Sequence, residues 1–115
     1  MEHKLVFMLK TYSNDLLYAQ RLISSYQKQN ANLIPMFIVV QEVDVELFEK
    51  FKDKNIQIIA EESVTDFLVK DDSVRGIRPG YINQEIIKLA FWELGLCENY
   101  LCLDSDAEFI RDFYF

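Results

Sequence analysis

Two aspartates one residue apart, Asp104 and Asp106, directly follow the apolar run of residues 100–103, with Ser105 between them. Carboxylates beside an apolar core are costly unless a cation meets them. Residues i and i+2 on extended backbone point to the same side, so both carboxylates can converge if strand geometry continues past Leu103. Such hard oxygen ligands suit Mg²⁺ or Mn²⁺, whose other positions substrate phosphates and water can fill. The pair therefore indicates a divalent-metal site, and the competing interpretation is a solvated strand end.

Two further groups of polar side chains could contribute to the same site. Lys10, Thr11 and Tyr12 end the first apolar run of the chain, and the tyrosine ring could stack on a nucleobase. At 100° per residue, Gln84 and Lys88 lie one turn apart on one face of an expected helix. The simpler interpretations of these two groups are a polar loop and a solvated helix face.

The elements that must position these residues alternate along the chain. Short apolar runs predict strands at 4–12, 33–40, 56–60 and 100–104. Apolar residues at helical spacing predict helices at 16–27, 44–51 and 81–94. This order indicates βαβ units, so we expect an α/β fold: a three-layer, Rossmann-like arrangement with a mostly parallel sheet and helices on both faces. In such sheets ligands bind outside the carboxyl ends of the strands, where the polar groups above are expected.

Local signals predict where several helices begin and end. Residues 13–15 (Ser-Asn-Asp) and Asp44 offer side chains that could cap the first and second helices. Residues 63–66 (Ser-Val-Thr-Asp) have the form of a capping box opening a brief helical turn through Phe67 and Leu68. Gly95 stands where glycine commonly ends a helix.

The overall charge excludes one class of partner. The chain carries 12 basic and 19 acidic residues, a net charge of −7. The nearest approach to a basic cluster is Arg75 and Arg78, in the polar loop of residues 70–80. We interpret this as a surface loop, the alternative being a phosphate clamp made of guanidinium groups. Nucleic-acid binding needs clustered Lys and Arg, so we expect no nucleic-acid partner.

Location and thiol chemistry follow from what the sequence lacks. No apolar run approaches the roughly 18 residues that a bilayer span needs, and the first residues lack the features of a signal peptide. We therefore expect a cytoplasmic protein with no transmembrane segment. Cys97 and Cys102 form no metal-binding or redox pattern and are expected to be structural thiols, and His3 is expected to have no functional role.

Residues 81–113, "YINQEIIKLAFWELGLCENYLCLDSDAEFIRDF", resemble the DxD region of the GT-A glycosyltransferase superfamily, in particular its bacterial glycosyltransferase-like proteins. The shared pattern is a helix with a Gln and a Lys, an apolar strand, and Asp-x-Asp followed by a hydrophobic run. The resemblance implies that Asp104 and Asp106 hold Mn²⁺ or Mg²⁺ against the diphosphate of a sugar nucleotide. It also implies donor-binding roles for a set of flanking residues: Lys10, Thr11, Tyr12, Gln84, Lys88, Asp104 and Ser105.

The resemblance further implies a function for the chain. Residues 1–115 would form a single α/β domain, the N-terminal, nucleotide-sugar-binding part of a longer metal-dependent glycosyltransferase. The acceptor would belong to surface glycan synthesis, as a glycan or a lipid-linked molecule. The acceptor site and catalytic base of this superfamily come from a later half, so we expect the chain alone to bind donor without transferring sugar. Three aromatics at positions 113–115 suggest an element cut short, whose apolar edge could drive self-association.

Other interpretations remain open. A non-catalytic α/β module could bind a nucleotide or a protein partner without metal. A haloacid-dehalogenase-like phosphatase also uses Asp-x-Asp after a strand, but expects Thr or Val at position 108, where this chain has Glu108. A receiver-like signalling domain expects an acidic pair after its first strand, where only Asp15 is present.

Overall fold

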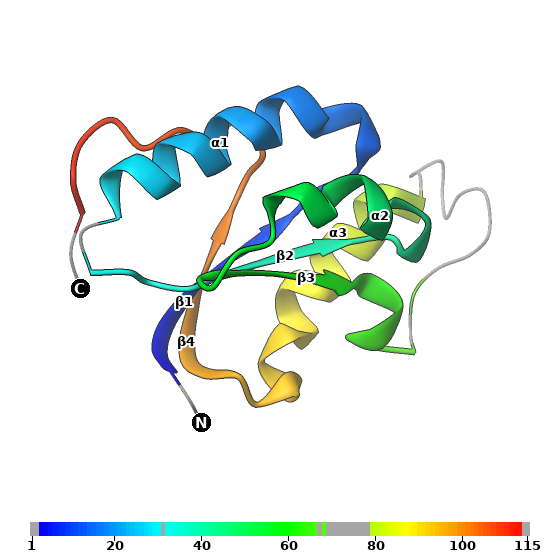
Figure 1. Ribbon diagram of the computed structural model, residues 1–115. Coiled ribbons are helices and arrows are strands. Elements are labelled where there is room, and N and C mark those ends of the chain that lie inside the picture. Colours follow the sequence, from blue (N-terminus) through cyan, green and yellow to red (C-terminus); the bar gives the residue numbers. More distant parts are fainter. Residues whose placement is uncertain (1–2, 31, 67, 69–78, 114–115) are drawn as a thin grey trace.

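The protein forms a four-stranded, all-parallel sheet with helices on both faces (Figure 1). The computed structural model describes residues 3–30, 32–66, 68 and 79–113, and the structural statements below concern these residues. The strands are β1 (His3–Lys10), β2 (Met36–Val40), β3 (Ile56–Ala60) and β4 (Cys97–Leu103). They lie in the order β3-β2-β1-β4, with every adjacent pair parallel. The predicted α/β class is thus confirmed.

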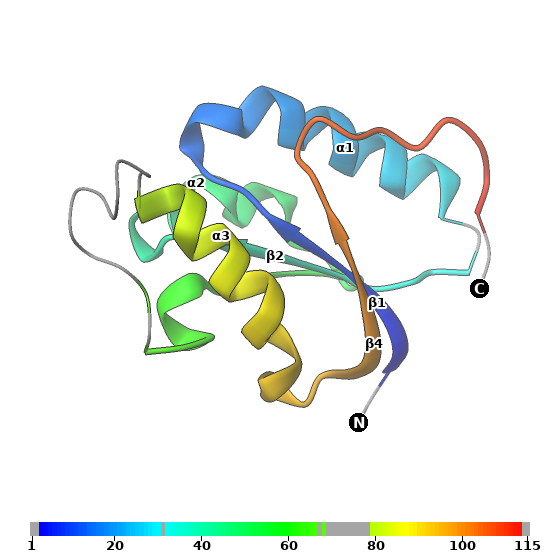
Figure 2. The same cartoon turned by 180° about the vertical axis from the view of Figure 1, so that it is seen from behind.

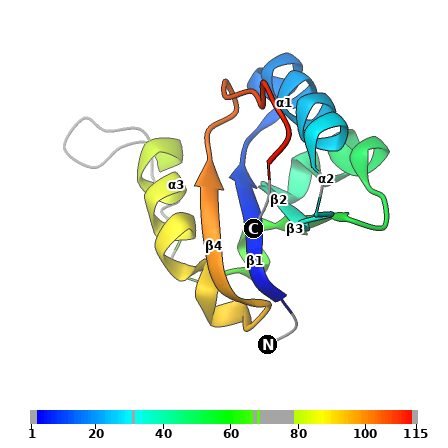
Figure 3. The same ribbon diagram turned by 90° about the vertical axis from the view of Figure 1, so that its left-hand side faces the viewer.

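The helices form the outer two layers of the fold. They are α1 (Leu16–Gln29), α2 (Val45–Phe48) and α3 (Pro79–Ala90). Five 3-10 turns flank them: η1 (Ser13–Asp15), η2 (Glu42–Asp44), η3 (Glu49–Phe51), η4 (Glu61–Ser63) and η5 (Phe91–Leu94). Figures 2 and 3 show α1 and α2 on one face of the sheet and α3 on the other. Among the described residues, no helix is long and apolar enough to cross a bilayer.

Side chains of β1 are buried on both faces of the sheet. Phe7 and Leu9 pack in the core cluster beneath α1 and α2, whereas Val6 and Met8 pack in the cluster beneath α3. Because successive side chains of a strand point to opposite faces, a strand buried on both sides must be apolar throughout. Strand β2 is likewise buried at all five positions, which explains its unbroken run of apolar residues.

Several predicted helix ends are wrong, although the helices themselves are confirmed. Neither Asp15 nor Asp44 makes a side-chain cap for the helix that follows it. The carboxylate of Asp44 instead accepts a hydrogen bond from the backbone N–H of Ser13, 3.1 Å away, and so supports η1. The expected capping box at Ser63 is replaced by η4, which ends at that residue, and the Ser63 hydroxyl donates to the carbonyl of Ala60 at 2.7 Å. Phe67, in the helical turn expected to follow, lies outside the described residues.

The predicted end of the third helix is confirmed. Gly95 follows η5 with a φ of +68°, and its N–H donates to the carbonyl of Trp92 at 3.1 Å. This left-handed conformation suits glycine because a Cβ would be strained there. Strand β4 begins two residues after Gly95, and the paired aspartates follow its carboxyl end.

The segment after β4 returns along α1 (Figure 2). The N–H of Phe109 donates to the Ser25 hydroxyl at 2.9 Å, and the N–H of Phe113 donates to the Gln29 carbonyl at 3.1 Å. Both rings pack against Phe7 in the core. Phe113 therefore contributes to this domain's own packing, contrary to the expectation of an exposed aromatic edge there, and residues 114–115 lie outside the described part.

Candidate functional site

The carboxyl ends of the parallel strands open onto a cleft of about 860 Å³. Its lining includes every residue predicted for the site except Lys88, namely Lys10, Thr11, Tyr12, Gln84, Asp104, Ser105 and Asp106. These residues come from the end of β1, from α3 and from the end of β4. The strand order places β4 beside β1, with Leu103 paired to Leu9, and so brings two of these groups together.

The two aspartates lie on a turn rather than on continued strand. Strand β4 ends at Leu103, and the N–H of Ala107 donates to the carbonyl of Asp104 at 3.0 Å. The expectation that strand geometry continues past Leu103 is therefore wrong. Asp104 and Asp106 are nevertheless both exposed and both line the cleft, with the buried Ser105 between them. The turn thus presents the two carboxylates on the solvent side of one short segment.

A buried hydrogen bond joins this turn to the end of β1. The Ser105 hydroxyl lies 2.9 Å from the Thr11 hydroxyl, and the two residues are 9% and 2% exposed. The N–H of Thr11 continues the sheet ladder by donating to the carbonyl of Val39 at 3.1 Å. Ser105 and Thr11 therefore line the cleft while their hydroxyls contact one another, and their expected donor-binding roles stay predictions.

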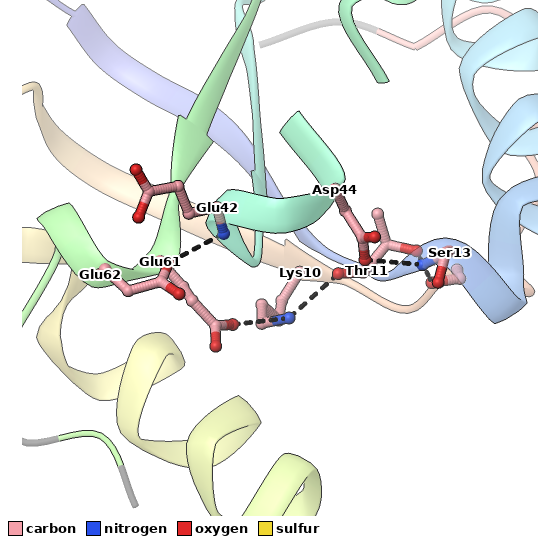
Figure 4. A network of polar contacts seen from close by, with 8 residues as sticks. Lys10, Thr11, Ser13, Glu42, Asp44, Glu61 and Glu62 are labelled. Carbon is pink, nitrogen blue, oxygen red and sulfur yellow. Dashed lines mark hydrogen bonds and ion pairs between the residues drawn. The ribbon is translucent and has the colours of Figure 1, made fainter. Parts of the chain in front are cut away.

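A buried ion pair lies elsewhere in the cleft (Figure 4). The ammonium of Lys10 lies 3.0 Å from Oε2 of Glu61, and their side chains are only 9% and 4% exposed. The same ammonium donates to the backbone carbonyl of Thr11 at 3.0 Å. Despite this proximity, Oε2 accepts no hydrogen bond of good geometry from the described residues. The charge of the carboxylate is thus compensated while its capacity to accept hydrogen bonds is not exhausted.

Lys88 is not among the residues that line the cleft, but it contacts Asp104, which is. Its ammonium lies 3.6 Å from Oδ1 of Asp104, whose side chain is 69% exposed, whereas that of Lys88 is 24% exposed. Solvent screening makes such a pair weak, so either partner can exchange it for a ligand at little cost. The structure thus places Lys88 beside Asp104, and its expected contact with a donor stays a prediction.

Aromatic side chains line the rim of the cleft. Tyr12 is 43% exposed and Tyr18, on α1, is 51% exposed. The turn η1 joins them, and the N–H of Asp15 donates to the carbonyl of Tyr12 at 3.1 Å. Exposed rings at a cleft offer flat surfaces on which a planar or sugar ring can pack. Tyr18 was not predicted as a site residue, because an aromatic residue in a helix with apolar periodicity carries no signal of its own.

Further cleft residues were also missed by the sequence analysis. They are Asp15, Gln41, Glu61, Asn83 and Glu85. Two of them carried a usable signal. Glu61 follows β3 directly, as Asp104 follows β4, and Asn83 is a polar residue one turn before the buried Ile87. The signal is weak because polar residues at strand ends and helix starts are common.

The cleft is acidic, which limits what it can bind. Its lining holds five carboxylates, on Asp15, Glu61, Glu85, Asp104 and Asp106, and its lysine, Lys10, is paired with Glu61. An anionic ligand would therefore need to bring a cation with it.

The cleft residues can bind a divalent ion only together with a ligand that supplies further oxygen atoms. Over residues 3–30, 32–66, 68 and 79–113, no group of three or more His, Cys, Asp or Glu is placed to hold a metal. Asp104 and Asp106 can supply one or two carboxylate oxygens, which is the usual protein share for Mg²⁺ held together with substrate phosphates. The residues present thus fit an ion that arrives with a phosphate ligand better than one held by the protein alone.

Neither cysteine is among the residues that line the cleft, and Cys97 lies at the opposite end of β4 from Asp104. Both cysteines are free, and burial raises the pKa of the Cys97 thiol. Burial is also the main cause that raises the pKa of Cys102, with the charge of Lys88 opposing it. A raised pKa keeps a thiol protonated and unreactive at neutral pH. Arg75 and Arg78, considered above as a phosphate clamp, lie outside the described residues.

Comparison with known proteins identifies a family without identifying an activity. The chain belongs to a family of unknown function, DUF6492, which it matches over residues 4–115. No curated protein matches the chain significantly.

Proposed function

We propose that this DUF6492 domain is the nucleotide-sugar-binding part of a metal-dependent glycosyltransferase that acts in bacterial surface glycan synthesis. The observation that carries the proposal is the gathering of three polar groups, far apart in the sequence, in one cleft at the carboxyl edge of the sheet. In parallel α/β sheets this edge is where ligands bind, particularly where the strand order reverses. Here the reversal falls at β1, between β2 and β4, and the Asp-x-Asp turn lies beside it.

The acidity of the cleft supports a metal-dependent ligand over a bare anion. A diphosphate approaching Asp104 and Asp106 would be repelled by both carboxylates. A divalent ion between the diphosphate and these carboxylates would attract both groups. When bound, the ion would neutralise negative charge on a diphosphate leaving group. The chain's own residues would orient that group, with Lys88 adding positive charge beside Asp104.

Tyr12 and Tyr18 are suited to the neutral rings of such a donor. Their exposed faces at the rim can pack on a base or a sugar, and stacking of a base on an aromatic ring contributes about 1–3 kcal/mol. Sugar transfer additionally requires an acceptor site and a base that deprotonates the acceptor. We propose that these lie outside residues 1–115, so that this chain by itself binds donor without efficient transfer.

Titration calorimetry with UDP, GDP and CDP, each with Mn²⁺ or with EDTA, tests the proposal. At least one nucleotide should bind ten or more times more tightly with Mn²⁺. Asp106→Asn should abolish that difference, because it removes one of the two carboxylates offered to the ion. Asp15→Asn is the matched control, since it removes the same charge from the cleft and leaves the Asp-x-Asp turn intact.

Two results would contradict the proposal. Binding that is equally tight in EDTA, or unchanged in Asp106→Asn, would instead favour a nucleotide-binding module that needs no metal. Absence of binding by all three nucleotides in Mn²⁺ would reject a nucleotide site altogether.

A further inference from the structure

The buried Lys10–Glu61 pair lies at some distance from the Asp-x-Asp turn along the same cleft. Glu61 directly follows β3, at one edge of the sheet, and Asp104 directly follows β4, at the other. The side chain of Glu61 reaches over β2 to the ammonium of Lys10, on the strand that neighbours β4. Glu61 and Asp104 both line one cleft. A ligand bound at both would lie across the ends of β1 and β2, and a nucleoside diphosphate with its phosphates at Asp104 would extend its base toward Glu61.

The pair is not explained by fold stability alone. A buried ion pair gains little over apolar side chains of similar size, because both charges lose their hydration. Glu61 lines the cleft, and its Oε2, enclosed beside the Lys10 ammonium, accepts no well-aligned hydrogen bond from the described residues. A carboxylate can accept about four hydrogen bonds, so a buried one with unused capacity can bind N–H groups of a ligand. Figure 4 shows the Glu61 carboxylate and the Lys10 ammonium meeting at this position.

We propose that Lys10 and Glu61 read the edge of the nucleobase and that the base is guanine, an inference that rests on the proposed nucleotide site. The pair sets a donor beside an acceptor group, since an ammonium only donates and a carboxylate only accepts. Guanine presents the complementary series, an O6 acceptor followed by the N1–H and N2–H donors. Uracil offers a single N–H between two carbonyls, and adenine and cytosine turn a ring-nitrogen lone pair toward a carboxylate.

Titration calorimetry in Mn²⁺ with GDP, IDP, UDP and ADP tests this assignment. IDP is guanine's informative analogue because it lacks only the 2-amino group. We expect GDP to bind about 10- to 100-fold more tightly than the other three, which corresponds to one hydrogen bond to a charged group. This comparison uses the unaltered protein and therefore does not depend on any variant folding.

Substitution of the carboxylate provides the second arm. In Glu61→Gln one oxygen becomes an amide that donates, so the preference for GDP over IDP should fall to within about threefold. Glu85→Gln is the matched control, because it removes the same charge from the same cleft at an exposed position and should keep the preference. Circular dichroism and the urea midpoint verify that each variant is folded.

The outcomes separate this inference from the proposed function. Metal-dependent binding of nucleotides without preference for GDP over IDP, or a preference that survives Glu61→Gln, would make the pair structural only and leave the nucleotide site standing. Failure of all four nucleotides to bind in Mn²⁺ would overturn both.

Discussion

The hydrogen bond between Ser105 and Thr11 should be a measurable link between the sheet and the candidate metal turn. Ser105→Ala leaves the buried Thr11 hydroxyl without this partner, and Thr11→Val does the same to Ser105. Each residue is at most 9% exposed, so water cannot freely replace the lost partner. Leaving a buried polar group unsatisfied costs about 1–3 kcal/mol, so we expect each single variant to lose about 1–2 kcal/mol of unfolding free energy.

The double variant makes this prediction specific. With both hydroxyls absent, neither group is left unsatisfied, so the combined loss should be about 1 kcal/mol smaller than the sum of the single losses. Urea unfolding measures the difference, since a loss of 1–2 kcal/mol moves the midpoint by roughly 1 M for a domain of this size. Strictly additive losses would show that the two hydroxyls do not interact and would refute the reasoning.

The same variants report on ligand binding. Ser105 separates Asp104 from Asp106, so loosening its contact with β1 should weaken Mn²⁺-dependent nucleotide binding several-fold. If the bond acts by positioning the turn, Ser105→Ala and Thr11→Val should weaken binding to a similar extent. A loss confined to Ser105→Ala would instead indicate that this hydroxyl contacts the ligand directly.

Two further predictions concern one residue each. Lys88→Met should change the unfolding free energy by less than about 0.5 kcal/mol, because its pair with Asp104 is well solvated, yet weaken Mn²⁺-dependent nucleotide binding measured by calorimetry; unchanged affinity would contradict its assigned role. Burial raises the pKa of Tyr26, so above about pH 10 the unfolded chain loses this proton before the folded one does, and stability falls as pH rises. Tyr26→Phe should therefore reduce the slope of unfolding free energy against pH by up to about 1.4 kcal/mol per unit, and equal slopes in both proteins would contradict the assignment.

Local patterns in the sequence were enough to predict the layers of the fold. The central residues of β1 and all of β2 form continuous apolar runs because both faces of these strands are covered. Such a run can be recognised from the local sequence alone. Gly95 was recognisable for a similar reason, since a left-handed helix end selects one residue type locally. The positions of Lys10 and Asp104 at strand ends followed from the same runs.

The candidate site itself was only partly contained in those patterns. The order of strands decides that β4 pairs with β1, which brings Ser105 to Thr11, and that β3 lies at the far edge, from which Glu61 reaches Lys10. Strand order results from how the connections pack helices on the two faces, and no local period encodes it. Asp44 supports η1 instead of its own helix for the same reason, because its contact with Ser13, 31 residues away, depends on long-range packing. Residue types and spacing thus determined which groups could do chemistry, whereas long-range packing decided which of them meet.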